Sequence, residues 1–313
     1  MKKTIIAGFF ILMIGILFTG YGYMKKGANP LYIDDWKPKV LTKVASKQVL
    51  SKNVSFKKIN IKDTTDDIVI TRGSHYQVSY QGIKGFQPSV SLSNGSLNIR
   101  QKKSLNNLIS ISNINEGGQK VIITIPKTVT LQDISANVTE GDMDIQNIKT
   151  QKIEVKSIDG DISIINMTAD SLRIYNENGD IEIGAQSKIT EGSFSLVNGD
   201  LTAHESSFSN ANMTNSYGDI ELLNSTVNGG QVKLTEGDFE GKKLGVTGKF
   251  SVTNRDGDNT ISLSNSSNIG YLMSTSDGDN TLFGKDVGSQ VTEKTNLVNQ
   301  IELTNESGDN EIN

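Results

Sequence analysis

The feature that most constrains the fold is a Gly-Asp pair that recurs nine times in the second half of the chain. Its glycines are Gly141, Gly160, Gly179, Gly199, Gly218, Gly237, Gly257, Gly278 and Gly308. Successive pairs lie 19, 19, 20, 19, 19, 20, 21 and 30 residues apart. A period this regular predicts a repeat architecture with one supersecondary unit per period.

Each unit contains two stretches in which apolar and polar residues alternate. The first follows the pair directly, as in GDISI (160–164) and GDIEI (179–183), and the second closes the unit, as at Leu172 and Ile174. Alternation with a period of two is typical of a half-buried strand. Each unit is therefore expected to contribute two strands, with glycine providing the positive φ of the corner between them.

Stacking such units in register places equivalent residues in columns, one coil about 4.8 Å above the next. The predicted fold class is all-β, a single-stranded β-solenoid with coils of about 19–20 residues, preceded by one N-terminal transmembrane helix. The competing fold is an antiparallel meander or sandwich in which each Gly-Asp pair is a hairpin turn. Hairpins do not require a constant register, so the repeat favours the solenoid.

The late units replace an apolar position with asparagine. The third residue of the unit becomes Asn259, Asn280 and Asn310, while the fifth stays apolar. Identical amides in register can bond along a stack, so these residues are expected to form an asparagine ladder. The final interval of 30 residues is expected to hold an extra loop, Val287 to Asn299.

Residues 51–140 are predicted to be an N-terminal β segment of the same solenoid. Short alternating, β-branched stretches such as DDIVITR and KVIITIP are typical of strands. The sequence Ser93-Asn94-Gly95-Ser96-Leu97 is interpreted as an imperfect copy of the Gly-Asp corner.

The N-terminus carries 19 consecutive uncharged residues, from Ile5 to Tyr23. As a helix they would extend about 28 Å, close to the thickness of a bilayer's hydrocarbon core. Lysines flank the segment as Lys2, Lys3, Lys25 and Lys26. A cleaved signal peptide is the alternative, but its apolar region is usually shorter and Gly20-Tyr21-Gly22 is a poor cleavage site.

The predicted organisation follows: a cytoplasmic head (1–4), a transmembrane anchor (5–23), a juxtamembrane stalk (24–50), the N-terminal β segment (51–140) and the Gly-Asp solenoid (141–313). A short head before an apolar segment is the geometry of an export signal. The expected location is therefore the cell membrane, as a single-pass protein with most of the chain outside the cytoplasm.

Charge differs strongly between the halves of the chain. Residues 1–140 carry 19 Lys/Arg and 8 Asp/Glu (+11), whereas residues 141–313 carry 12 and 27 (−15). The acidic half makes nucleic acid an unexpected partner, and the simplest interpretation of both charges is solubility of an elongated surface. With no cysteine in the chain, neither a disulfide nor a thiolate metal site is available.

Several of these sequence features together resemble a known family. The sequence Ile125-Pro126, the linking stretch TVTLQDISANVTEGDMDI and the train of GD-I-x-I units resemble the bacterial adhesin-like β-strand-repeat domain of unknown function, which includes the LiaG-like membrane-anchored proteins. The resemblance covers about residues 50–312 and implies a membrane-tethered β-solenoid outside the cytoplasm, with a link to cell-envelope stress. It implies no activity.

No catalytic or cofactor motif stands out. The two histidines, His75 and His204, lie in distant strand-like segments without ligand spacing, and a solvated surface role is the simpler interpretation of both. No catalytic, metal or cofactor residue is therefore predicted, and the chain is expected not to be an enzyme.

The aspartates of the repeat would form one column along the stack. Its members are Asp142, Asp161, Asp180, Asp200, Asp219, Asp238, Asp258, Asp279 and Asp309. Like charges at this spacing repel, so bound Ca²⁺ could relieve them, although solvated turn residues explain them more simply.

Three functions remain open from the sequence. The first is a non-enzymatic binding, adhesin-like or envelope-stress protein that engages a cell-wall polymer or another envelope protein. The second is a polysaccharide-acting enzyme, which requires carboxylates unlike their counterparts in neighbouring coils. The third is a calcium-stabilised adhesive rod.

Overall fold

The computed structural model describes residues 2–24, 31–34, 37–40, 42–50, 54–101, 109–110 and 118–313. The flanking residues Lys25 and Lys26 and the first residue of the predicted head lie outside the described residues. Helix α1 (Lys2–Met24) is followed by a small three-stranded sheet in the order β2 (Lys37–Val40), β1 (Leu31–Asp34), β9 (Ile109–Ser110). Within the described residues, no helix meets the length and hydropathy expected of a membrane span.

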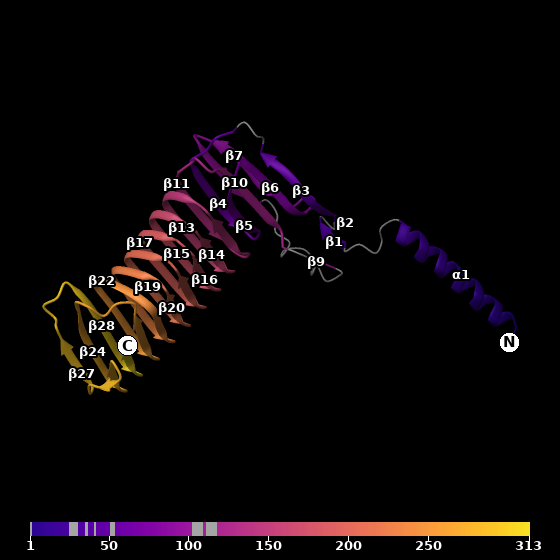
Figure 1. The fold of residues 1–313 in the computed structure, drawn as a ribbon. Helices are drawn as coiled ribbons and strands as arrows, with labels where there is room; N and C mark the ends of the chain where they lie inside the picture. Colours follow the sequence, from indigo (N-terminus) through magenta and orange to yellow (C-terminus); the bar gives the residue numbers. More distant parts are fainter. Residues whose placement is uncertain are drawn as a thin grey trace.

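The rest of the chain forms an elongated stack of coils, which lie side by side along its length in Figure 1. Each coil of the central stack runs through a long strand, a Gly-Asp corner and a short strand, and neighbouring coils pair in parallel. The long strands form one wall, here called the long-strand sheet, and the short strands form the opposite wall, the short-strand sheet. Parallel pairing excludes the antiparallel meander and confirms the predicted all-β solenoid.

The long-strand sheet has the following order along the stack: β7 (Ser89–Ser93), β8 (Ser96–Arg100), β4 (Lys58–Thr64), β11 (Leu131–Val138), β13 (Lys149–Asp159), β15 (Thr168–Asn178), β17 (Lys188–Asn198), β19 (Ser207–Tyr217), β21 (Thr226–Glu236), β22 (Phe239–Asp256), β28 (Asn299–Ser307), β24 (Ile269–Asp277) and β27 (Gln290–Glu293).

The short-strand sheet has the order β3 (Lys43–Leu50), β6 (Gln77–Ile83), β10 (Lys120–Pro126), β5 (Asp67–Gly73), β12 (Met143–Gln146), β14 (Ile162–Ile165), β16 (Ile181–Gly184), β18 (Leu201–His204), β20 (Ile220–Leu223), the start of β22, β23 (Asn259–Leu263), β29 (Asn310–Ile312), β25 (Asn280–Leu282) and β26 (Lys285–Asp286).

The core lies between the two walls and is built from columns of buried apolar side chains. Ile162 pairs with Ile181 on the short wall, and Val155 pairs with Ile174 on the long wall, and all four are at most 2% exposed. The alternation read from the sequence places these residues inward and their neighbours outward.

The corner glycines stack directly on one another. A Cβ added to Gly199, whose φ is +125°, would lie 2.2 Å from the carbonyl oxygen of Gly179. The same close approach joins each corner to the preceding one from Gly160 to Gly257. Glycine is thus required both for the positive φ and for the contact between coils.

The order of the last two coils differs from the expectation that consecutive corners are neighbours. Gly308 stacks on Gly257, and Gly278 stacks on Gly308, so the C-terminal coil is inserted between two earlier coils. The expected loop at 287–299 holds strand β27, which pairs antiparallel with the outermost strand β24. The long interval gives the chain enough length to cover this edge and return, and a covered edge is protected from pairing with other chains.

The N-terminal end has the same arrangement. The coil of β4 and β5 lies between the coil of β8 and β10 and the coil of β11 and β12. The interpretation of Ser93–Ser96 as a corner is wrong, because these residues turn the antiparallel hairpin β7–β8. Asn94 and Gly95 both have positive φ, as the two-residue hairpin turn favoured by an Asn-Gly pair requires.

The predicted asparagine ladder is confirmed, in an order set by the inserted coil. Asn259 Nδ2 donates to Asn310 Oδ1, and Asn310 Nδ2 donates to Asn280 Oδ1, both at 2.8 Å. All three side chains are fully buried. Their amides tie the C-terminal coil to the coil on each side of it.

Candidate ligand-binding site

The column of corner aspartates is held by hydrogen bonds between coils. The backbone N–H of each aspartate donates to Oδ1 of the aspartate in the adjacent coil, over 2.8–3.1 Å from Asp67 to Asp279. One oxygen of each paired carboxylate is therefore used by the backbone. Within the described part of the chain, no group of three or more potential metal-ligating side chains is assembled.

The first member of this column was missed from the sequence. Asp67 accepts the N–H of Asp142, and Asp66 occupies the place of the corner glycine beneath Gly141. Burial raises the pKa of Asp66 to about 7, opposed by a hydrogen bond from Gln101 and reinforced by the nearby Asp67 charge. An Asp-Asp pair in place of Gly-Asp breaks the repeat pattern, so the spacing alone did not identify it.

The two histidines lie in different parts of the stack. His75 lies between β5 and β6, where its Nδ1 is 2.8 Å from Ser74 Oγ. His204 ends β18 and its Nε2 is 3.1 Å from Glu182 Oε1, on the outer face of the short-strand sheet. The two histidines therefore do not share a site.

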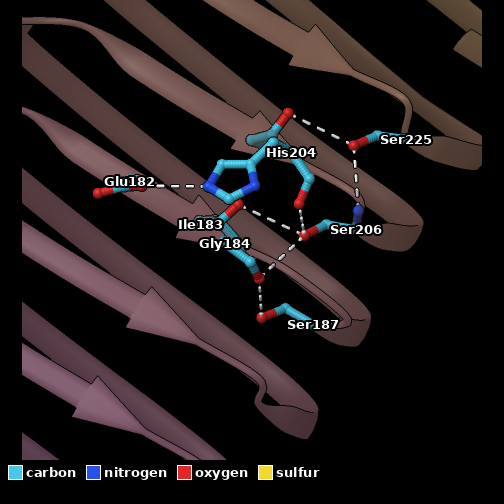
Figure 2. A network of polar contacts seen from close by, with 8 residues as sticks. Glu182, Ile183, Gly184, Ser187, His204, Ser206 and Ser225 are labelled. Carbon is cyan, nitrogen blue, oxygen red and sulfur yellow. Dashed lines mark hydrogen bonds and ion pairs between the residues drawn. The ribbon is translucent and has the colours of Figure 1, made fainter. Parts of the chain in front are cut away.

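His204 lies close to three buried serines, Ser187, Ser206 and Ser225, at the second corner of successive coils (Figure 2). Ser206 Oγ donates to backbone carbonyls, including that of His204 at 3.0 Å, and Ser187 Oγ donates to the carbonyl of Gly184 at 2.7 Å. A serine nucleophile needs its hydroxyl bonded to the imidazole. These hydroxyls instead satisfy the corner backbone, and the imidazole points to Glu182.

A hollow of about 370 Å³ lies on the outer face of the long-strand sheet, across β15, β17 and β19. Its lining residues are Ser171, Arg173, Glu191, Gly192, Ser193, Asn210 and Asn212. This volume is within the range of small-molecule clefts. The lining offers hydroxyls, amides, one guanidinium and one carboxylate, which can donate and accept hydrogen bonds.

Small inward residues underlie this hollow. Gly192 pairs with Leu172 of the previous coil, and Ala211 pairs with Gly230 further along, so the core side chains are small beneath the hollow. Phe194 fills part of the space beneath, because a Cβ added to Gly192 would lie 2.8 Å from its ring. The run of small residues in one column is the sequence signal that could have indicated the hollow.

Cations gather on the same outer face, toward the N-terminal end of the stack. The exposed members of this group, here called the basic patch, are Lys58, Lys62, Arg100, Lys152, Lys156 and Arg173. Arg173 belongs to both the basic patch and the hollow. The outer face of the long-strand sheet is therefore continuous from a charged region into a hydroxyl- and amide-lined one.

Comparison with known proteins identifies the class. A solenoid of parallel Gly-Asp coils defines a β-repeat domain, and residues 56–313 match the family model described as Toastrack DUF4097. The chain belongs to this family of β-repeat domains of unknown function, which confirms the resemblance drawn from the sequence. The search of curated proteins found no match.

Three solved structures are similar. A "putative lipid binding protein" from Parabacteroides distasonis has 10% identity and a TM-score of 0.46, covering 86% of this chain and 96% of its own. A "putative adhesin" from Parabacteroides merdae has 11% identity and a TM-score of 0.45, covering 87% and 96%. A "putative adhesin" from Bacteroides fragilis has 14% identity and a TM-score of 0.32, covering 87% and 97%.

The aspartate column generates a test of the calcium-stabilised rod. Asp200→Ala removes the acceptor for the N–H of Asp219 and is expected to lower the free energy of unfolding by about 1–2 kcal/mol. Asp200→Asn keeps an Oδ1 acceptor and is expected to lower it less. Thermal unfolding measures both variants, and a chelator is expected to leave the melting temperature of the wild-type protein unchanged. A melting temperature that falls with chelator would support the calcium rod.

Proposed function

We propose that this protein is a non-enzymatic binding module, anchored to the cell membrane by its N-terminal apolar segment, that engages a hydroxylated polymer outside the cytoplasm. The observation that carries the proposal is the polar hollow on the outer face of the long-strand sheet. In this hollow, hydrogen-bonding side chains of three adjacent coils surround one space.

The chemistry of the lining supports a polyol ligand such as a polysaccharide. Serine hydroxyls and asparagine amides each donate and accept, which matches the alternating donors and acceptors of sugar hydroxyls. Tyr175, two residues beyond Arg173 on the same face, is 41% exposed and offers a ring with an apolar face beside the hollow. Because the coils repeat, a polymer can extend along the stack from one coil to the next.

Binding is favoured over catalysis by the positions of the acidic and basic side chains among the described residues. The His204–Glu182 pair lies on the short-strand sheet, the wall opposite the hollow, and the neighbouring serine hydroxyls donate to backbone carbonyls. Within the hollow, Glu191 is the lining carboxylate, whereas acid–base hydrolysis of a glycosidic bond generally requires two. A polysaccharide-acting enzyme is the second candidate and is addressed by turnover assays on the same polymers.

The anchor is supported by the 19 uncharged residues from Ile5 to Tyr23, within helix α1. Protease treatment of intact cells checks this part of the proposal. Digestion of the chain beyond residue 50 is expected, and complete protection of the solenoid would contradict an extracytoplasmic location.

Filling the hollow tests the binding site. Ser193→Trp places a large ring in the hollow from an exposed position and is expected to weaken binding to a polyol polymer on the order of tenfold. The matched control is Thr253→Trp, exposed on the same sheet face but outside the hollow, which is expected to bind as the wild type does. The measurement is affinity of the full-length protein, held in a neutral lipid nanodisc, for immobilised dextran and poly(glycerol phosphate). Equal binding by both variants to every polymer would contradict this site.

A further inference from the structure

We infer that the basic patch selects a linear polyanion, a polymer that carries phosphodiester or carboxylate groups along a hydroxylated backbone. This inference rests on the proposed function. It adds the charge of the ligand and the part of the long-strand face that binds the charged groups. The ligand would lie along the stack, with its anionic groups on the patch and its hydroxyls in the adjoining hollow.

The register of the strands sets the cations in rows. Lys58 of β4 and Lys152 of β13 both pair with Asp133 of the strand between them, so they lie in one row two coils apart. Lys62 pairs with Arg100 in a second row. With coils about 4.8 Å apart, the patch extends over roughly 19 Å from β8 to β15. That length suits several repeating units of a polymer better than one small anion.

Positive charge exceeds negative charge in the middle of the patch. Arg173 pairs in register with Glu154, and Lys152 Nζ bonds Glu154 Oε2 at 3.0 Å. The Lys152 ammonium lowers the pKa of the Glu154 carboxyl below its usual value, and Lys156 and Arg173 lower it further. One carboxylate is thus shared by three cations, and within the described residues Lys156 and Arg173 have no ion-pair partner within 4.0 Å.

The carboxylates in and around the patch leave this excess in place. Asp133 of β11 lies in register within the row of Lys58 and Lys152. Asp63 lies 3.8 Å from Arg100, with both side chains about 70% exposed, so the pair is solvated and weak. Asp170 and Glu177 lie at the two ends of β15 and border the patch. The six cations of the patch therefore outnumber the three carboxylates among them, Asp63, Asp133 and Glu154, by three charges.

The opposite wall shows that the cations are not spread evenly over the solenoid. One outward row of the short-strand sheet aligns Asp144, Ser163, Glu182, Thr202, Glu221 and Glu240. Lys242 lies beside this row and is already paired with Glu221 at 3.2 Å and Glu240 at 2.7 Å. A polyanion would be attracted to the long-strand face and repelled by the short-strand face.

A polyanionic polymer is favoured over an anionic lipid surface by the continuity of patch and hollow. A lipid surface would attract the cations but would leave the serine and asparagine lining of the hollow unused. A polymer with both phosphates and hydroxyls uses the two regions together, because Arg173 belongs to both.

The test compares charge reversal inside and outside the patch. Lys58→Glu/Lys156→Glu is expected to weaken binding of poly(glycerol phosphate) by about tenfold at about 0.1 M salt, where the Debye length is about 10 Å, while leaving binding of neutral dextran unchanged. The control is Lys233→Glu/Lys285→Glu, which makes the same change of net charge. Lys233 lies on the same outer row as Lys156, four coils further along, so the control is expected to bind within about twofold of wild type.

The full-length protein in a phosphatidylcholine nanodisc is used throughout, with melting temperatures to confirm folding. Equal weakening by both charge variants would overturn the inference, since it would indicate a response to net charge alone. If the wild type still binds dextran and Ser193→Trp weakens that binding, the proposed function would stand without the inference. If the wild type binds neither polymer, both would be overturned. Loss of polymer binding when phosphatidylglycerol replaces part of the disc lipid would assign the patch to the lipid surface and also overturn the inference.

Discussion

The structure depends on the close approach of backbone at the Gly-Asp corners. A Cβ at these glycines would lie 2.2–2.4 Å from the carbonyl oxygen of the stacked glycine from Gly160 onward, well inside van der Waals contact. This contact fixes the register of neighbouring coils, and register in turn fixes which side chains form each column. The aspartate beside each glycine adds a bond between the same two coils. The inward columns, the asparagine ladder and the outward rows all follow from this alignment.

A stack of this kind exposes two edges, and both are closed in the same way. At each end the terminal coil of the chain lies one place inward, and hairpin strands cover the outermost coil: β7 and β6 at one end and β27 and β26 at the other. Short hairpin strands at the ends are poor templates for pairing with other chains, and the faces of the walls remain as surfaces for a ligand. Those faces differ in chemistry, with cations and a polar hollow on the long-strand wall and an acidic row on the short-strand wall.

Much of this fold could be predicted from the sequence, because a fixed period identifies the equivalent residues of every coil. The two strands per coil, the parallel register through Gly257 and the bonding of Asn259, Asn280 and Asn310 followed from that reasoning. The order of the last coils could not be predicted. The period shows that Gly278 and Gly308 are equivalent, but it does not show which of them lies next to Gly257. The hairpin at Asn94-Gly95 could have been predicted, because an Asn-Gly pair between two alternating stretches favours a two-residue hairpin turn.

The candidate site was less accessible from the sequence. Its members come from three coils and meet only when the register is known, and each serine or asparagine is unremarkable in a chain rich in both. The column from Leu172 to Gly192 thins the core beneath the hollow, a feature that depends on alignment between coils. The charge difference between the two halves of the chain did not reveal the basic patch, because Lys152, Lys156 and Arg173 belong to the acidic half. The location of these cations on one wall could be found only after the structure showed which residues of each strand face outward.

The central claim is that corner glycines are required by contact between coils, beyond their positive φ. The most direct measurement compares the unfolding free energies of Gly199→Ala and Gly85→Ala. Gly199 has a φ of +125° and lies against Gly179, whereas Gly85 has a φ of +94° with nothing within 4 Å of an added Cβ. Both substitutions strain the backbone, and Gly199→Ala is expected to cost at least about 2 kcal/mol more because of the contact between coils. Equal losses would show that the turn conformation alone explains the glycines and would contradict the stacked corners.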